Sequence, residues 1–257
     1  MIHLGLIGYP LGHSFSARFF AEKFAKEGID AQYTPYAFPS LSETLHNTQV
    51  AALDGFNVTY PYKEAIIPYI DDLDATARAI GAVNVVKRIG NRRIGYNTDC
   101  IGFANDLRKW LHTEALPSPT RALVLGTGGA AKAVIYGLQR MGIAVRVVSR
   151  NTHAKGALFT SHTPLLSYSD LNEDIIRSYT LIINCTPLGM TPDSGTCPPI
   201  PYAALGSSHM LYDCVYNPAE TLFLHKGRMQ GTHTRNGLGM LLGQAEAAWE
   251  IWSNAER

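Results

Sequence analysis

The 257-residue sequence lacks several features that would assign it to a specialised class of protein. It has no excess of charge, because 22 Lys and Arg residues offset 21 Asp and Glu residues to a net charge of +1. A polybasic nucleic-acid-binding or membrane-binding protein is therefore excluded, and any basic site has to be local. No apolar run approaches the roughly 18 residues of a membrane helix. The sequence also has no internal repeat and no low-complexity tract.

Cysteine is scarce. The four cysteines include no Cys-x-x-Cys pair, and no histidine cluster flanks them. A zinc site is therefore not expected, and a chain of this length can bury a core without disulfides. The N-terminal segment has neither a basic stretch nor the apolar run of a signal peptide. We expect a cytoplasmic protein with reduced thiols and no bound metal, and the 46% apolar content is typical of one or two globular domains.

The first part of the chain mixes short strands with helices. Strands are predicted at Ile2–Ile7, Gln32–Phe38 and Asp54–Thr59, and a hairpin at Ala82–Val86 and Arg93–Tyr96 that turns at Gly90-Asn91. Helices are predicted after Gly12 with Gly28 as the C-cap, over Leu41–Val50, from Pro61 onward, and over Ile101–Leu111. The Pro- and Ser-rich stretch at 116–120 indicates a boundary or a long loop.

From Arg121 onward the pattern changes. Four continuous apolar segments, RALVL, VRVVS, TLIINCT and HMLYDCV, alternate with helical segments. Strands that are apolar throughout are covered on both faces, and their alternation with helices predicts a parallel, doubly wound α/β sheet. The stretch from Gly237 to Trp252 predicts a last helix.

A glycine-rich loop joins the first of these strands to a helix. It reads Gly126-Thr127-Gly128-Gly129-Ala130-Ala131 and fits the pattern G-x-G-x-x-[GA] in the strand–loop–helix context that a dinucleotide fingerprint requires. The first glycine permits the turn, the second lets the backbone approach a pyrophosphate, and the helix N-terminus offers free N–H groups. A turn without a ligand is the alternative, but three glycines are costly in a plain turn.

The end of the following strand distinguishes NADP from NAD. An NAD site has an acidic residue there for the ribose 2′-hydroxyl, whereas this chain has Ser149 and Arg150 and no acid. A guanidinium can hold a 2′-phosphate bidentately, and Lys155 could add charge. NADP(H) is therefore the expected cofactor. The alternative is that Arg150 is a solvated loop residue.

Candidate catalytic residues precede the loop. Asn57 and Thr59 are two apart in a predicted strand and share one face. Lys63 is predicted in the first turn of the helix that Pro61 opens, where a cation is unfavourable without an anionic partner. Asp99 lies at a predicted strand–helix junction. A Lys–Asp couple could give a proton to the alkoxide formed during carbonyl reduction. The alternatives are a surface lysine and a helix-capping aspartate.

Seven segments resemble, in order, motifs of the shikimate dehydrogenase family: GYPLGHSFS, NVTYPYK, GAVNVV, GYNTDCIGF, INCTPLGM, DCVYNPAETLFL and NGLGMLLGQA. The glycine-rich loop is similar to the family's phosphate loop. The resemblance implies catalysis by Lys63 with Asp99. It also implies substrate contacts from Ser14, Ser16, Asn57, Thr59, Asn84, Tyr216 and Gln244, and cofactor contacts from Thr186, Gly237 and Met240. Helix capping by Ser14 or Ser16, core packing of Tyr216 and Met240, and a solvated Gln244 are the alternatives.

The resemblance implies an α/β fold with an N-terminal substrate-binding domain (1–100), a Rossmann-type doubly wound NADP domain (101–235), a cleft between them, and a C-terminal helix (236–257) returning to the first domain. The expected reaction is reversible NADPH-dependent reduction of 3-dehydroshikimate to shikimate. The expected partner is this small molecule, with no nucleic acid or membrane, and the protein is expected to be a monomer or a homodimer. The alternatives are a quinate/shikimate dehydrogenase using NAD and a non-catalytic sensor of shikimate or a dinucleotide.

The chain departs from the family pattern in the cofactor loop. Thr127 replaces the usual alanine, and Lys132 replaces a frequent arginine. Ser149-Arg150-Asn151 replaces the usual Asn-Arg-Thr. The family often has a second arginine four residues later, where this chain has Ala154 followed by Lys155. Thr127 fits the turn and is expected to have little effect, whereas the last two differences predict a looser preference for NADP, unless Lys155 substitutes for the missing arginine.

Overall fold

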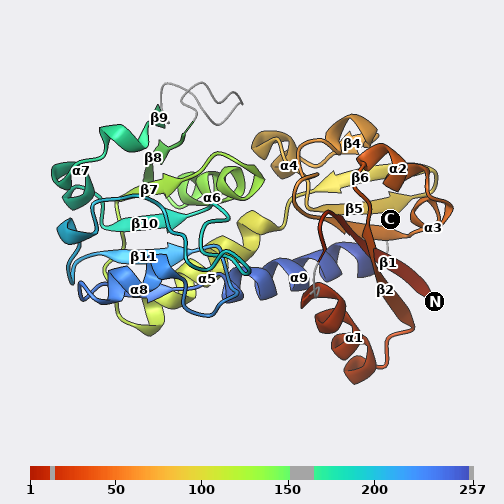
Figure 1. Cartoon of the computed structure of the whole chain (residues 1–257). Helices are drawn as coiled ribbons and strands as arrows, with labels where there is room; N and C mark the ends of the chain where they lie inside the picture. Colours follow the sequence, from red (N-terminus) through yellow and green to blue (C-terminus); the bar gives the residue numbers. More distant parts are fainter. Residues whose placement is uncertain (12–14, 151–164, 255–257) are drawn as a thin grey trace. The chain divides into compact units, whose positions relative to one another are not determined.

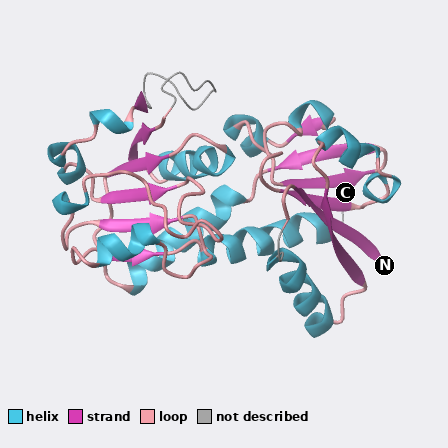
Figure 2. Ribbon diagram, in the orientation of Figure 1, coloured by secondary structure: helices cyan, strands magenta, loops and turns pink. Residues whose placement is uncertain are grey.

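The computed structural model describes residues 1–11, 15–150 and 165–254. The chain forms two compact units, one of residues 1–98 together with 245–257 and one of residues 99–244. Each unit contains a six-stranded sheet with helices packed on it (Figure 1, Figure 2). The last helix, α9 (Leu238–Ser253), contributes residues to both units. The domain limits expected at residues 100 and 235 and the cleft stay predictions.

The sheet of the first unit is mixed, with the strand order β2-β1-β3-β5-β6-β4. Its strands are β1 (Ile2–Gly8), β2 (Ala31–Ala37), β3 (Gly55–Val58), β4 (Asp72–Leu73), β5 (Val85–Ile89) and β6 (Arg92–Tyr96). Strand β1 pairs in parallel with β2 and β3, and β5 pairs antiparallel with β3 and β6. The β5–β6 hairpin turns at Gly90, whose φ of 59° lies in the left-handed region that glycine tolerates. The predicted hairpin is therefore confirmed.

Apolar clusters cover both faces of this sheet. One face packs against α2 (Leu41–His46), α3 (Thr48–Ala51) and α4 (Ala75–Ile80). The other face packs against α1 (Phe15–Glu27) and the C-terminal part of α9. There the Trp252 indole donates to the Val86 carbonyl at 3.0 Å and occupies the space that any side chain at Gly55 would need. Position 55 therefore requires glycine.

Two helix predictions in this unit are wrong. The helix expected over Leu41–Val50 is broken into α2 and α3 at Asn47, whose backbone is extended and whose side chain caps α3 at 2.9 Å from Gln49 N. The helix expected from Pro61 is absent, and residues 60–66 form turns before a short 3₁₀ helix at Ile67–Tyr69. Pro68 limits the length of any α-helix begun at Pro61, because it has no N–H to donate to the carbonyl four residues before it.

The sheet of the second unit is parallel throughout, with the order β12-β11-β10-β7-β8-β9. Its strands are β7 (Arg121–Leu125), β8 (Ala144–Val148), β9 (Leu165–Leu166), β10 (Leu181–Asn184), β11 (Met210–Asp213) and β12 (His233–Arg235). The chain goes from β7 outward to β8 and β9 and then returns to β10 on the other side of β7. This reversal of direction is the topological switch point at which doubly wound sheets bind ligands.

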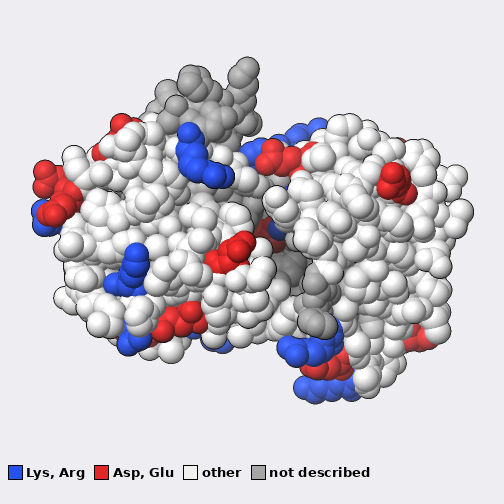
Figure 3. Space-filling view, in the orientation of Figure 1, with Lys and Arg blue, Asp and Glu red and all other residues white. Residues whose placement is uncertain are grey.

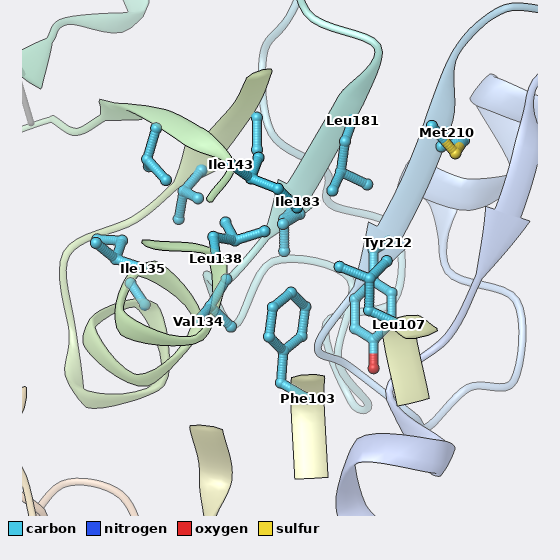
Figure 4. Close-up of a cluster of buried hydrophobic side chains, with 14 of the residues drawn as sticks. Phe103, Leu107, Val134, Ile135, Leu138, Ile143, Leu181, Ile183, Met210 and Tyr212 are labelled. Carbon is cyan, nitrogen blue, oxygen red and sulfur yellow. The ribbon is translucent and has the colours of Figure 1, made fainter. Parts of the chain in front are cut away.

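Alternate residues of these strands point to opposite faces of the sheet. On one face they pack against α5 (Asp99–Thr113) and α6 (Gly129–Arg140), as Figure 4 shows for Phe103, Leu107, Val134 and Leu138. On the other face they pack against α7 (Glu173–Arg177), the 3₁₀ helix at Tyr202–Ala204 and α8 (Leu222–Arg228). A further 3₁₀ turn covers Tyr168–Asp170. Helices on both faces explain why these strands are apolar throughout.

The predicted fold class is confirmed: the chain is α/β, with a mixed N-terminal sheet followed by a six-stranded parallel sheet. Among the described residues, no helix combines the length and apolar character needed to cross a membrane.

Candidate active site

In the first unit, several predicted substrate contacts lie in or beside the strands β3 and β5. Asn57 is buried in β3, and Thr59 follows the end of that strand. The Asn57 amide nitrogen donates to the Asn84 backbone carbonyl at 3.1 Å, and its oxygen accepts from the Tyr33 hydroxyl at 2.7 Å. The structure therefore brings Asn57 and Asn84 together with a tyrosine that the sequence analysis missed.

Asn84 is almost fully buried and lies directly before β5. Its side-chain oxygen accepts from the Thr98 backbone N–H at 2.7 Å, and its amide nitrogen donates to the Thr98 hydroxyl at 2.9 Å. Asn84 thus binds both the backbone N–H and the side-chain hydroxyl of Thr98, the residue immediately before Asp99. The predicted contact of Asn84 with substrate hydroxyls stays a prediction.

Lys63 lies in a turn, not at a helix N-terminus, so the helix-dipole argument for an anionic partner does not apply to it. The side chain is half-buried. Its backbone carbonyl accepts from Val83 N at 2.8 Å, which ties the turn to the segment that carries Asn84. Asp99 is buried and is the first residue of α5, where the positive end of the helix stabilises its carboxylate. Lys63 and Asp99 belong to different units, and their meeting stays a prediction.

In the second unit, the glycine-rich loop lies between β7 and α6 at the switch point. Gly126 has a φ of 113°, which a residue with a side chain rarely adopts, and its N–H donates to the Val148 carbonyl at 2.8 Å. Gly128 is exposed, and a Cβ built on it would meet nothing within 4 Å. Its backbone is therefore open to a ligand.

The N-terminus of α6 is suited to a phosphate. The first intrahelical bond runs from Lys132 N to the Gly128 carbonyl at 3.0 Å, and the first turn holds no acidic residue. The preceding N–H groups, including those of Gly129 and Ala130, are the groups that a helix N-terminus directs at an anion. The loop thus fits a dinucleotide pyrophosphate.

The end of β8 carries the residues expected to select the cofactor. Ser149 is buried beside the loop, with its hydroxyl 3.5 Å from that of Thr127, whereas Arg150 is exposed. No acidic residue stands where NAD would need one, so the pattern fits a 2′-phosphate. The predicted contacts Ser14 and Lys155 lie outside the described residues.

The carboxyl ends of β10 and β11 carry a buried polar network next to the loop. Thr186 is held at this edge because its hydroxyl and backbone N–H both donate to the Asn184 side-chain oxygen, at 2.6 and 3.0 Å. Its methyl group would lie 3.2 Å from a Cβ at Gly126. The Asn184 amide nitrogen in turn donates to the Asp213 carboxylate at 3.0 Å.

Asp213 is fully buried and was not predicted as a functional residue. Burial raises the pKa of its carboxyl group to about 6, although hydrogen bonds from Thr221, Val215 N and Asn184 act in the opposite direction. These bonds fix the segment 213–221, which contains Tyr216. One sequence signal could have identified Asp213. It is an acidic residue at the end of an apolar strand, followed by a threonine eight residues later.

The remaining predicted residues differ in how deeply they are buried. Tyr216 is 36% exposed, so its alternative as a core residue is wrong. Met240 packs in the core cluster of the second unit. Gln244 is buried and its amide donates to the Leu241 carbonyl at 3.0 Å, so its solvated alternative is wrong. A side chain at Gly237 would clash with the Cys214 carbonyl, so this position requires glycine. Their ligand contacts stay predictions.

On the face shown in Figure 3, Lys and Arg are interspersed with Asp and Glu among uncharged residues. Among the residues that the structure describes, no group of three or more His, Cys, Asp or Glu could hold a metal ion.

Comparisons with known proteins agree with this arrangement. Residues 6–86 match the family model described as the shikimate dehydrogenase substrate binding domain. A shikimate dehydrogenase (NADP(+)) of Symbiobacterium thermophilum is 37% identical over 97% of this chain and 88% of its own length.

Two solved structures are similar along the whole chain. The shikimate 5-dehydrogenase of Thermus thermophilus in complex with NADP(H) and shikimate has a TM-score of 0.85 at 30% identity, covering 98% of this chain and 94% of its own. The quinate dehydrogenase of Corynebacterium glutamicum in complex with NAD also has a TM-score of 0.85, at 26% identity, covering 99% and 94%. The identity and coverage of the Symbiobacterium enzyme settle the family: the chain belongs to the shikimate dehydrogenases.

Proposed function

We propose that the protein is an oxidoreductase that reversibly reduces 3-dehydroshikimate to shikimate with NADPH. One observation carries the proposal: a shikimate dehydrogenase (NADP(+)) is 37% identical over 97% of the chain. Lys63 and Asp99, the residues proposed for the proton chemistry, are both present in the chain.

The proton chemistry is assigned to Lys63 and Asp99. Reduction of a ketone leaves a developing alkoxide, which needs a proton donor within hydrogen-bond reach. Lys63 is proposed as that donor, and as the acceptor in the reverse direction. Asp99 is proposed to orient Lys63 and to assist the transfer. Their roles are supported by the buried position of Asp99 and by the half-buried turn that carries Lys63.

Substrate binding is assigned to polar residues of both units. The carboxylate is proposed to bind Ser14 and Ser16. The ring hydroxyls are proposed to contact Asn57, Thr59, Asn84, Asp99 and Gln244, with Tyr216 nearby. The buried network around Asn57 and Asn84 supports this assignment, because its amides are held in fixed orientations before any ligand binds.

NADP(H) is the cofactor, and it supplies the hydride when bound. The chain's part is to hold it. Gly126, Thr127, Gly128, Gly129 and Ala130 are proposed to bind the pyrophosphate, and Ser149, Arg150 and Lys155 the 2′-phosphate. Thr186, Gly237 and Met240 are proposed at the adenine and nicotinamide. The open backbone at Gly128 and the acid-free first turn of α6 support this assignment.

A second candidate function is a dehydrogenase that accepts quinate and NAD. The likeness to the Corynebacterium quinate dehydrogenase in complex with NAD favours it. Arg150 and the absence of an acid at the end of β8 oppose it, because an NAD site uses a carboxylate there.

The deciding experiment follows nicotinamide absorbance with purified protein, crossing shikimate and quinate with NADP⁺ and NAD⁺. Turnover confined to shikimate with NADP⁺ supports the proposal. Comparable rates with quinate or NAD⁺ replace it with the broader dehydrogenase. Binding without turnover in all four combinations would instead support a non-catalytic sensor.

The proposed partner is the small substrate alone, with the protein acting as a monomer or a homodimer. Light scattering during size-exclusion chromatography distinguishes these two states. The cytoplasmic location stays a prediction.

A further inference from the structure

Tyr33 of β2 connects two residues proposed to bind substrate, although nothing in its sequence context indicated such a role. Its hydroxyl donates to the Asn57 side-chain oxygen at 2.7 Å, and Ser16 lies close enough to the phenol to act on its pKa. All three residues belong to the first unit, so this contact does not depend on the second. We propose that Tyr33 is a positioning residue, which orients the Asn57 amide for the ring hydroxyls of the substrate.

The hydrogen-bond directions around Asn57 are determined by its neighbours. A backbone carbonyl can only accept, so the atom facing the Asn84 carbonyl at 3.1 Å has to be the Asn57 amide nitrogen. The amide oxygen therefore faces Tyr33, and the phenol proton goes to it.

This arrangement leaves Asn57 complementary to a hydroxyl group. An amide has two donor hydrogens and an acceptor oxygen with two lone pairs. The contacts with Asn84 and Tyr33 use one hydrogen and one lone pair. The other hydrogen and lone pair can both be used by a hydroxyl, which donates and accepts. Because two separate contacts fix the amide plane, Asn57 presents that pair without having to lose rotational freedom on binding.

The tyrosine is itself held rigidly. Its ring stacks on Phe20 with centroids 4.6 Å apart and lies 6.3 Å from the Trp252 ring. Burial raises the pKa of the phenol, with Ser16 opposing the change, so the hydroxyl stays protonated. Packing fixes the ring and the hydroxyl fixes Asn57. Removing the hydroxyl alone therefore separates positioning from packing.

The inference rests on the proposed function, and its test uses the whole enzyme. Tyr33→Phe keeps the ring and removes only the hydroxyl. We expect the KM for shikimate to rise about tenfold, which corresponds to one lost hydrogen bond, whereas kcat and the KM for NADP⁺ change less than about threefold. Tyr202→Phe is the matched control, because its hydroxyl also donates to an acceptor at 2.8 Å but is not proposed to bind substrate or cofactor.

A double-mutant cycle with Asn57→Ala distinguishes positioning from a general structural effect. If Tyr33 acts through Asn57, the loss of kcat/KM caused by Tyr33→Phe becomes at least about threefold smaller in the Asn57→Ala background. Equal losses in both backgrounds, or an unchanged KM in Tyr33→Phe, would overturn the inference while the function stood. A wild-type enzyme without activity on shikimate would overturn both. An unchanged circular dichroism spectrum and an unchanged midpoint of urea unfolding show that each variant is folded.

Discussion

The hydroxyl of Thr221 reaches back eight residues to the buried carboxylate of Asp213, at 2.5 Å. Val215 N and Asn184 donate to the other oxygen of the same carboxylate at 2.9 and 3.0 Å. One acid at the end of β11 thus organises the segment that leads to Tyr216. The same acid makes stability depend on pH.

Asp213→Asn is expected to change the pH dependence of unfolding. The folded-state pKa of Asp213, about 6, lies above its ordinary value of 3.8. The folded protein therefore binds more protons than the unfolded chain between these values. The wild type should lose stability relative to Asp213→Asn as the pH rises from 4 to 6, by up to about 3 kcal/mol. Urea unfolding of both proteins at pH 4.5 and 7 checks the sign, and a wild type that gains stability relative to the variant over this range would contradict it.

Thr98→Val is expected to destabilise the protein by about 1–2 kcal/mol, because the Asn84 amide loses an acceptor at 2.9 Å in a buried site. Thr232→Val is the matched control. Its hydroxyl is buried and has no hydrogen-bond partner among the described residues, so the change should be neutral or stabilising. Chemical denaturation of both variants tests the contrast, and equal losses would count against it.

Lys63→Ala is expected to lower kcat by about 10²- to 10⁴-fold, because it removes the proposed proton donor, with a much smaller change in the KM for shikimate. Lys26→Ala removes an exposed lysine of α1 in the same unit and should leave both constants unchanged. Steady-state kinetics in the direction of shikimate oxidation measure the effect. Near-normal turnover of Lys63→Ala would refute its role.

Arg150→Ala is expected to raise the KM for NADP⁺ about tenfold or more and to leave the KM for NAD⁺ within about twofold, because only NADP⁺ carries the 2′-phosphate. Arg140→Ala, at the exposed end of α6, serves as the control. Equal effects of Arg150→Ala on the two cofactors would show that this arginine does not select between them.

The second unit was predictable because its signals are local. The apolar strands, the glycines of the loop and the residues after β8 each lie within a few positions of one another, and their turn chemistry fixes their conformation. The wrong prediction of a helix from Pro61 also came from reading a local signal. Proline at a first helical position also suits a turn, and Pro68 leaves too little chain after Pro61 for a long α-helix.

The network in the first unit could not be predicted in this way. Tyr33 contacts Asn57 across the sheet, 24 residues away, and Asn84 contacts Thr98 at a separation of 14 residues. Such contacts depend on strand register and side-chain packing, which no local pattern encodes. The resemblance to a family identified Asn57 and Asn84, but it did not identify the tyrosine that holds one of them.

The Trp252 indole at Gly55 has a consequence for synthesis on the ribosome. The first unit consists of the first 98 residues and the last 13, whereas the second unit is continuous. Because a chain emerges from its N-terminus, the second unit can complete its core while Phe20 and Val85 still lack Ala245, Ala248 and Trp252 as packing partners. We therefore expect the substrate side of the enzyme to mature last, and a released chain truncated before residue 245 to bind NADP but not shikimate.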